Sequence, residues 1–528
     1  MSATKALEIP EIVHLIGLNI PVLDTFNHRF YQEPYNPKTL LNCCLVSKSW
    51  RAILLPVLWR LYDGNRMSIV PRHIVIQYRS LFRYYRGQVM PLSEEEEGRE
   101  REQERGNQDV APSHAITSCA SKDLDSSINL EVQPQQQKQQ QSHYNGLDCR
   151  NLLELEVLFT SQQPPYLSAP LPVYFGLLRS NPQLKEVVLY STIRAPRLAM
   201  SALGNCTKLL RLTIVRFTTA QGDGVASDLG RFLRPVSATL TTLYLVELEG
   251  NPIDPTTIWL PQVTDLTIDV SNDSGTHSSM KLEELIARCP SLVRLLVYPR
   301  ELSTKLDRLA ALIKSHCPKL TSIWIPRALS TDTEVCKVIR AVTAGRLLSL
   351  NCTVPRTTKG LQEAIRAHQE SLETLKIEVA FYIREPVDYV NGREAGVAEL
   401  IVEQMVFLQE VLDSFLSLKE LSFKDRRDRT SELEFYDALM HRPWNCLSLE
   451  RLKLEGGIYD VWDREALVPG RPFGGGGWRI DRKELGRAKN IRLNYGLLRR
   501  LLRHVSALPR LSTVRAVGLT CVRNADLS

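Results

Sequence analysis

An aliphatic triplet spaced as L-x-x-L-x-L recurs along most of the chain and constrains its fold more than any other feature. Three aliphatic residues at this spacing suit a strand that sends alternate side chains into a core. One triplet means little in a leucine-rich sequence, but these recur at intervals of 23 to 46 residues, close to one strand-plus-helix unit each. The triplets are Leu152-Leu155-Val157, Leu184-Val187-Leu189, Leu209-Leu212-Ile214, Leu240-Leu243-Leu245, Val263-Leu266-Ile268, Leu292-Leu295-Val297, Leu320-Ile323-Ile325, Leu347-Leu350-Cys352, Leu372-Leu375-Ile377, Leu418-Leu421-Phe423 and Leu449-Leu452-Leu454.

Between triplets the apolar spacing changes to about 3.6 residues, which favours a helix. In two places such a stretch ends at Cys-Pro, at Cys289-Pro290 and Cys317-Pro318, and a leucine two residues later begins the next triplet. This turn resembles the Cys-Pro-x-Leu turn of leucine-rich repeats in F-box proteins. The sequence therefore predicts an α/β fold in which residues 146–528 form a solenoid, with parallel strands on the concave face and helices on the convex face.

Residues between the triplet positions are expected to point outward on the strand face, where a partner protein can bind. We single out Trp324, because an exposed tryptophan beside other aromatic, aliphatic and arginine side chains is typical of binding hot spots. The candidate target-binding residues are Tyr244, Arg294, Leu296, Trp324, Lys376 and Arg451. The alternative is that Trp324 packs beneath a loop or lies out of register with the predicted strand.

The segment from Asn36 to Trp59 predicts a partner of a different kind. Asn36 and Pro37 suit a helix start and Pro56 a helix end, so we expect one helix from Pro37 to about Leu55. Its apolar residues fall on two sides, one with Val46, Trp50, Ile53, Leu54 and Val57 and the other with Leu41, Cys44 and Leu45. A single intramolecular neighbour would not cover both sides. A second amphipathic helix is expected to begin at Pro10.

Together these segments resemble an F-box. The resemblance depends on Ile9-Pro10-Glu11, Leu45-Val46-Ser47-Lys48-Ser49-Trp50-Arg51 and Pro56-Val57-Leu58-Trp59, and it covers roughly residues 7 to 60. The sequence departs from the family where Glu11 directly follows Pro10, where extra residues lie around 24–35, and at Ser47. The resemblance implies that a Skp-type adaptor binds Ile9, Pro10, Ile12, Leu41, Cys44, Leu45 and Val46. It also implies that Trp50, Leu58 and Trp59 hold the small domain together.

The motifs and the local composition together divide the chain into domains. We expect an all-α F-box domain at 1–62, a linker and repeat cap at 63–92, and loops near 380–396 and 469–478. Residues 93–145 contain an acidic run and a glutamine tract, so we expect a disordered insertion there, with a regulatory tail as the alternative. The net charge of +7 is small for 528 residues, which gives no support to nucleic-acid binding.

No catalytic pattern is convincing. The histidines lack H-x-x-x-H and H-E-x-x-H spacing, no G-x-S-x-G occurs, and the glycine run before Trp478 lacks the Gly-Lys-Ser/Thr of a phosphate loop. The eleven cysteines form no CxxC pair, so neither a zinc module nor a set of disulfides is expected. We expect no cofactor, no metal, no membrane span and no active site of its own, with residence in the cytoplasm, the nucleus or both.

The resemblance therefore implies a substrate-recognition subunit of a Skp, cullin and F-box (SCF) type ubiquitin ligase. Its partners would be a Skp-type adaptor, a cullin reached through that adaptor, and a target protein of unknown identity. The alternative is an interaction scaffold that uses the same repeats without ubiquitin transfer. Sequence alone does not separate the two.

Overall fold

The computed structural model describes residues 9–20, 38–63, 70–89, 149–159, 171–191, 197–198, 200–219, 228–248, 258–270, 282–300, 306–326, 331–380, 394–425, 444–456, 478–480, 501, 508–516 and 519–523. The chain divides into two compact units. Unit 1 comprises Met1–Leu240 with Glu247–Gly250, and unit 2 comprises Thr241–Val246 with Asn251–Ser528. Within the described ranges, no helix combines the length and apolar character needed to cross a bilayer.

Unit 1 begins with three helices and continues with parallel strands. The helices are α2 (Pro10–Asn19), α3 (Lys38–Val46), α4 (Lys48–Leu58), α5 (Arg72–Tyr78), α8 (Leu171–Ser180) and α9 (Asp228–Val236), with 3-10 turns η2 (Arg79–Leu81) and η4 (Met200–Asn205). The strands are β1 (Leu61–Asp63), β2 (Tyr84–Val89), β3 (Glu154–Phe159), β4 (Glu186–Ser191), β5 (Arg197–Leu198), β6 (Arg211–Val215) and β7 (Thr218–Thr219). Strands β1, β2, β3, β4 and β6 pair in parallel in that order.

Unit 2 continues the alternation of strand and helix. Its strands are β8 (Thr242–Val246), β9 (Asp265–Val270), β10 (Arg294–Pro299), β11 (Ser322–Ile325), β12 (Ser349–Val354), β13 (Thr374–Val379), β14 (Glu420–Asp425), β15 (Arg451–Gly456), β16 (Trp478–Ile480), β17 (Thr513–Ala516) and β18 (Leu519–Arg523). Its helices are η6 (Leu282–Arg288), α10 (Asp307–His316), α11 (Asp332–Ala341), α12 (Lys359–Arg366) and α13 (Glu394–Ser414).

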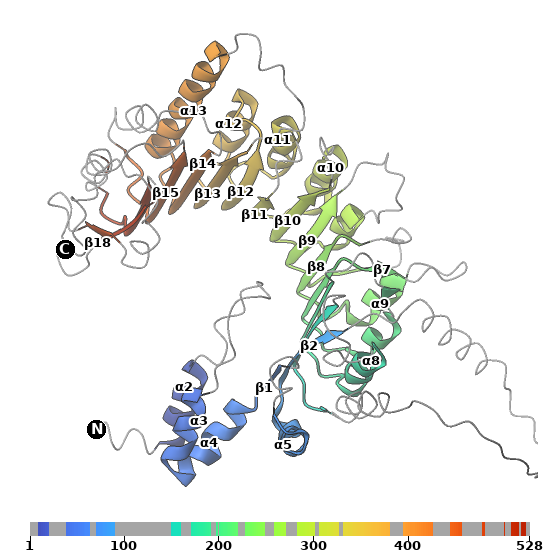
Figure 1. The fold of residues 1–528 in the computed structure, drawn as a ribbon. Helices are drawn as coiled ribbons and strands as arrows, with labels where there is room; N and C mark the ends of the chain where they lie inside the picture. The colour runs from blue at the N-terminus through green and yellow to red at the C-terminus, as the bar shows by residue number, and fades with distance from the viewer. Residues whose placement is uncertain are drawn as a thin grey trace, which may run out of the picture. The chain divides into compact units, whose positions relative to one another are not determined.

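The strands of unit 2 form an open sheet with helices along one face. Strands β8 to β15 and then β17 pair in parallel, each with the next, and β18 and β16 close the sheet antiparallel. Helices α11, α12 and α13 lie along one face of β11–β15 (Figure 1). The structure thus confirms the predicted α/β fold with a repeat-like parallel sheet.

The predicted triplets form the core of both units. Every triplet residue named above is at most 2% exposed, and each triplet enters the strand that its spacing predicts. Parallel strands covered on one face by helices favour such aliphatic residues at alternate positions. The neighbouring repeat supplies the cover that a single repeat lacks.

A turn before each strand sets the register of the repeats. In most repeats the amide of the first triplet residue donates to the carbonyl three residues earlier, over N–O distances of 3.1–3.4 Å, as in Leu292 to Cys289 and Leu320 to Cys317. The repeats of Leu240 and Leu372 contain one more residue and donate to Val236 and His368 instead.

The residue that begins this turn is buried and links neighbouring repeats. Asn181 accepts from the Leu152 amide at 2.9 Å and donates to the carbonyls of Cys149 and Leu177 at 2.5 and 2.7 Å. Cys446 occupies the equivalent position and donates to the Phe415 carbonyl at 3.1 Å. At Asn181 and Cys446, the first residue of the turn therefore satisfies backbone groups of the preceding repeat.

Several sequence-based expectations need correction. Helical segments before Asn205 and Cys289 are 3-10 turns, and residues 394–396 belong to α13 although a loop was predicted to reach 396. The triplets did not predict strands β1 and β2, which precede the first triplet. The buried residues Tyr62 and Tyr85 of these strands are aromatic and so do not match the aliphatic pattern. The insertion predicted at 93–145 lies outside the described residues.

Candidate functional surfaces

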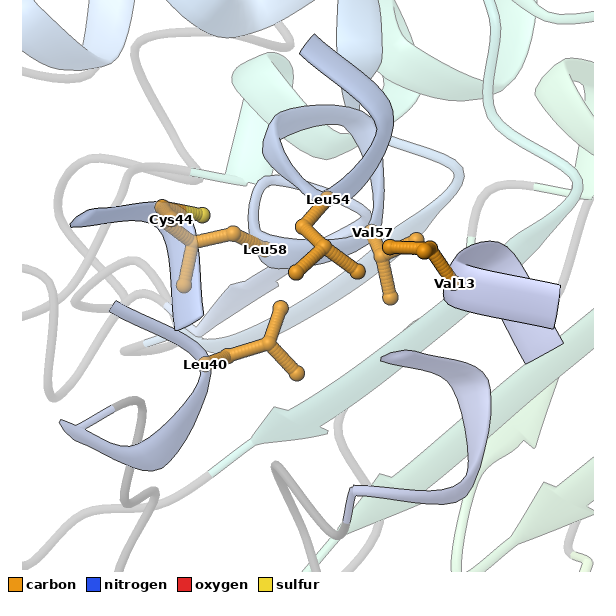
Figure 2. Close-up of a cluster of buried hydrophobic side chains, with 6 residues drawn as sticks. All are labelled: Val13, Leu40, Cys44, Leu54, Val57 and Leu58. Atoms are coloured by element: carbon orange, nitrogen blue, oxygen red, sulfur yellow. The ribbon is translucent and has the colours of Figure 1, made fainter. Parts of the chain in front are cut away.

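Helices α2, α3 and α4 enclose a small apolar core. It consists of Val13 from α2, Leu40 and Cys44 from α3, and Leu54, Val57 and Leu58 from α4, which point toward one another (Figure 2). A Cβ atom at Gly17 would overlap the Leu54 side chain, so the glycine permits close approach of α2 and α4. Trp50 and Trp59 pack against this cluster, and Trp59 also stacks on Tyr78 with ring centroids 4.7 Å apart.

Ser47 divides the predicted single helix into α3 and α4. Its backbone is extended (φ −157°, ψ 164°), and its hydroxyl accepts a hydrogen bond from the Trp50 amide at 3.1 Å. This is N-cap geometry, which serine favours because its side chain satisfies a free amide of the first turn. The predicted helix from Pro37 to Leu55 is therefore wrong in two ways, since Pro56 lies inside α4, which ends at Leu58.

Helix α3 leaves one of its apolar faces exposed. Leu40 and Cys44 point into the core, whereas Leu41, Leu45 and Val46 are 45%, 80% and 66% exposed. Leu41 and Leu45 are four residues apart and so share one side of the helix. We call Leu41, Leu45 and Val46 the α3 surface. Three large aliphatic side chains exposed together on a short helix are more informative than the scattered apolar residues of any protein surface.

The other predicted adaptor-binding residues differ in accessibility. Pro10 is exposed, and Ile9 and Ile12 are half-buried at the start of α2. Cys44 is only 7% exposed, and burial, together with neighbouring Cys43, raises the pKa of its thiol. Cys44 therefore supports the α3 surface from within. The predicted adaptor-binding set omits Leu15 and Leu18, which are exposed on α2 and whose i, i+3 spacing places them on one side of that helix.

The sheet of unit 2 brings all the candidate target-binding residues to the face opposite the buried triplets. Row one of this open face is Asp265, Arg294, Ser322, Ser349, Thr374, Glu420 and Arg451, each aligned with the next on the neighbouring strand. Row two is Tyr244, Thr267, Leu296, Trp324, Asn351, Lys376, Ser422 and Lys453. Trp324 is 43% exposed, so the alternative in which a loop covers it is not observed.

Ion pairs organise the charges of this open face. Arg294 pairs with Asp265 across β9 and β10. Glu420 lies between two cations, with Oε1 2.7 Å from Lys376 Nζ and Oε2 2.9 Å from Arg451 Nη2. Burial opposes ionisation of Glu420, but both cations outweigh it and lower the pKa of its carboxyl.

The buried thiols are weak nucleophiles. Burial raises the pKa of Cys317 to about 12, and the same cause raises the pKa of Cys206, Cys352 and Cys446 to about 12. A thiol with such a pKa is protonated at neutral pH. Among the residues that the structure describes, no three His, Cys, Asp or Glu side chains come together in a way that could hold a metal ion.

No protein-family model matches this sequence, and no curated protein matches it significantly.

Proposed function

We propose that this chain is the substrate-recognition subunit of an SCF-type ubiquitin ligase. In this proposal α2–α4 form the F-box domain, which binds a Skp-type adaptor, and the repeats form a leucine-rich-repeat solenoid, which binds the target protein. The observation that carries the proposal is the α3 surface. The three helices of the segment that resembles an F-box build an apolar core of six residues and still leave Leu41, Leu45 and Val46 exposed.

The energetics favour a protein partner for the α3 surface. Fully burying a leucine or valine side chain contributes about 1.5–3 kcal/mol relative to leaving it in water. Leu45 and Val46 retain most of their accessible area in the folded chain, so a docking partner would gain a large part of this contribution from each. Exposed aliphatic residues on one helix suit a partner that offers a helix-binding groove.

The proposed role in ubiquitin transfer is to raise local concentration. The adaptor and cullin would bring a ubiquitin-charged enzyme near a target held by the repeats, so that its lysines react at a high effective concentration. This chain would supply no acid, base or nucleophile. The open face of unit 2, with Trp324 and its ion pairs, supports the target-binding part of the proposal.

A co-purification experiment tests adaptor docking. We expect Leu41→Ala with Leu45→Ala to abolish capture of a purified Skp-type adaptor by the full chain, because truncating a central interface leucine costs about 2 kcal/mol, or about thirtyfold in affinity. The matched control is Leu416→Ala with Leu447→Ala, which removes two leucines that are 65% and 57% exposed in turns of the repeats. If both folded variants capture the adaptor equally well, the adaptor binds elsewhere on the chain. If neither variant nor the unmodified chain captures it, the adaptor is not a partner.

Capture of a cullin separates the ligase from the scaffold. A ligase subunit should bring a cullin along with the adaptor, and the double variant should lose both together. Adaptor without cullin, or neither, would favour an interaction scaffold built on the same repeats.

A further inference from the structure

Two adjacent strands of unit 2 bring no charge to its open face. Strands β11 and β12 contain no acidic or basic residue. The next charges in the two rows are Arg294 on β10 and Lys376 on β13, and each has an ion-pair partner, Asp265 and Glu420 respectively. We define the uncharged belt as the row-one and row-two residues of β11 and β12, which are Ser322, Trp324, Ser349 and Asn351.

The polar side chains of the uncharged belt have no hydrogen-bond partners. Within the part of the chain that the structure describes, none of the four makes a side-chain hydrogen bond. Trp324 is 43% exposed, and the other three residues are half-buried. The N–H of an indole only donates, and hydroxyl and amide side chains also contain donors. The belt therefore combines one large aromatic ring with unused hydrogen-bond donors.

The backbone of these strands is already paired within the sheet. Strand β11 lies between β10 and β12, and β12 lies between β11 and β13 (Figure 1). A bound segment therefore cannot add a strand here and must lie over the side chains. Where such a segment covers the ring of Trp324, its own backbone loses water. Each N–H that finds no new acceptor then costs free energy, which favours a residue without an N–H.

Proline is the residue that meets this requirement. It has no backbone N–H, and its ring is apolar. A polyproline II segment makes no internal hydrogen bonds, so its carbonyls are free to accept from the donors of the belt. Leu296, directly opposite Trp324 on β10, extends the apolar area beside the indole ring. Aromatic surfaces suit such segments, because a preformed polyproline II helix loses little entropy when it binds.

Strand spacing sets the length of segment that fits. Neighbouring strands lie about 4.8 Å apart, so the distance from Leu296 on β10 to Asn351 on β12 is about 10 Å along the row. A polyproline II segment advances about 3.1 Å per residue. About three to four residues therefore cross the three strands.

We propose that unit 2 binds an uncharged, proline-containing segment of its target protein across β10–β12. A proline ring of that segment lies on Trp324 and Leu296, and its carbonyls accept hydrogen bonds from Trp324 Nε1 and from the Asn351 amide. Charged residues are disfavoured over the belt, because they lose water and β11 and β12 contain no counter-charge. An oligosaccharide fits less well, since Leu296 offers it no hydrogen bond. The proposal rests on the proposed function only in calling the bound protein a ubiquitination target.

Peptide selection on the full chain tests this proposal. The probe is a random dodecapeptide display library, selected on the unmodified chain and on three variants. Trp324→Ala removes the ring and the donor, whereas Trp324→Phe keeps a ring and removes only the N–H. The matched control is Trp259→Ala, which removes another tryptophan of unit 2, 53% exposed in the segment before β9. Thermal unfolding verifies that all variants are folded.

We expect the unmodified chain and the control to enrich peptides that contain proline within a run of about four uncharged residues. The best peptide, resynthesised, should bind Trp324→Ala about thirtyfold and Trp324→Phe about tenfold more weakly than the unmodified chain. Replacing its proline by alanine should weaken binding about tenfold. No enrichment, enrichment of peptides with charged residues in that run, or unchanged binding by either Trp324 variant would overturn the proposal.

A further arm tests a sugar as the ligand. Chitotriose titrated into the unmodified chain should bind more weakly than the best peptide, and tighter binding would overturn the assignment of a protein segment. None of these measurements uses the adaptor. Failure of selection therefore leaves adaptor capture intact, and failure of adaptor capture leaves the peptide result intact.

Discussion

The three N-terminal helices and the repeats use leucine in opposite ways. Every triplet residue of the repeats is at most 2% exposed, because neighbouring strands and helices cover it. Helices α2–α4 bury a core of six residues and leave Leu41, Leu45 and Val46 outside it. The repeats also expose leucines such as Leu416 and Leu447, but these are single turn residues of separate repeats and not neighbours on one helix.

This difference is why we propose the α3 surface as the binding site of the adaptor. An array of repeats covers its own apolar faces, since each unit is the partner of the next. A three-helix segment is too small to do so on every side of its helices. Spacing alone predicted apolar faces in both regions, and burial in the structure separates the faces that are filled from the α3 surface, which stays exposed.

Leucine truncation in the two regions should give the largest contrast. Leu375→Ala removes a fully buried side chain from β13 and should lower the free energy of unfolding by about 3 kcal/mol, through lost burial and a residual cavity. Leu45→Ala should change it by less than about 0.5 kcal/mol. Chemical denaturation of each variant measures both values. A large loss for Leu45→Ala would mean that the chain itself covers the α3 surface.

A polar pair extends the contrast to hydrogen bonds. Asn181→Ala should cost about 2 kcal/mol, because it leaves the buried Leu152 amide without its partner and removes the hydrogen bonds to the Cys149 and Leu177 carbonyls. Asn19→Ala removes an exposed bond to the Leu15 carbonyl on α2 and should cost less than about 0.5 kcal/mol. Similar costs in denaturation would show that the turn asparagine does not hold neighbouring repeats together.

A smaller, pH-dependent effect belongs to the strand face of unit 1. Burial, the facing carboxylate of Glu186 and, to a smaller extent, Glu156 raise the pKa of Glu154 to about 7. Arg211 and Arg60 oppose this rise. The folded chain therefore keeps a proton that the unfolded chain loses above its ordinary pKa of 4.5. Stability from this group falls as the pH rises from about 4.5 through about 7.

Glu154→Gln removes this penalty. At pH 8 we expect the variant to be more stable than the unmodified chain by about 1 kcal/mol, a value reduced for the partial exposure of the side chain. The two should be equally stable near pH 4.5. Denaturant unfolding at both pH values measures the gap. A gap that does not change with pH would contradict the raised pKa, and adding Glu186→Gln should gain less than the sum of the single changes.

The repeats could be predicted from sequence because their signal is local. A period of two within each triplet determines which side chains are buried, and the same period places Trp324 on the opposite face of the sheet. Strands β1 and β2 were not predicted, because Tyr62 and Tyr85 fill positions at which the triplet pattern requires aliphatic residues.

The N-terminal helices were harder to predict because packing decides their rotation. Spacing grouped Leu41, Cys44 and Leu45 on one side, but the core takes Cys44 and leaves both leucines outside. The break at Ser47 depends on one hydroxyl bonded to the Trp50 amide, which competes with a continuous helix by a small free energy. Such choices follow from tertiary contacts that a single sequence does not specify.

Hydrogen exchange of the full chain with a purified Skp-type adaptor tests the central claim most directly. We predict that amides of α3 become protected as adaptor is added, reach a plateau at one adaptor per chain, and remain unprotected in Leu41→Ala with Leu45→Ala. Helix α11, within the repeats, should not change. Binding with no protection of α3, or no binding at all, would contradict the account.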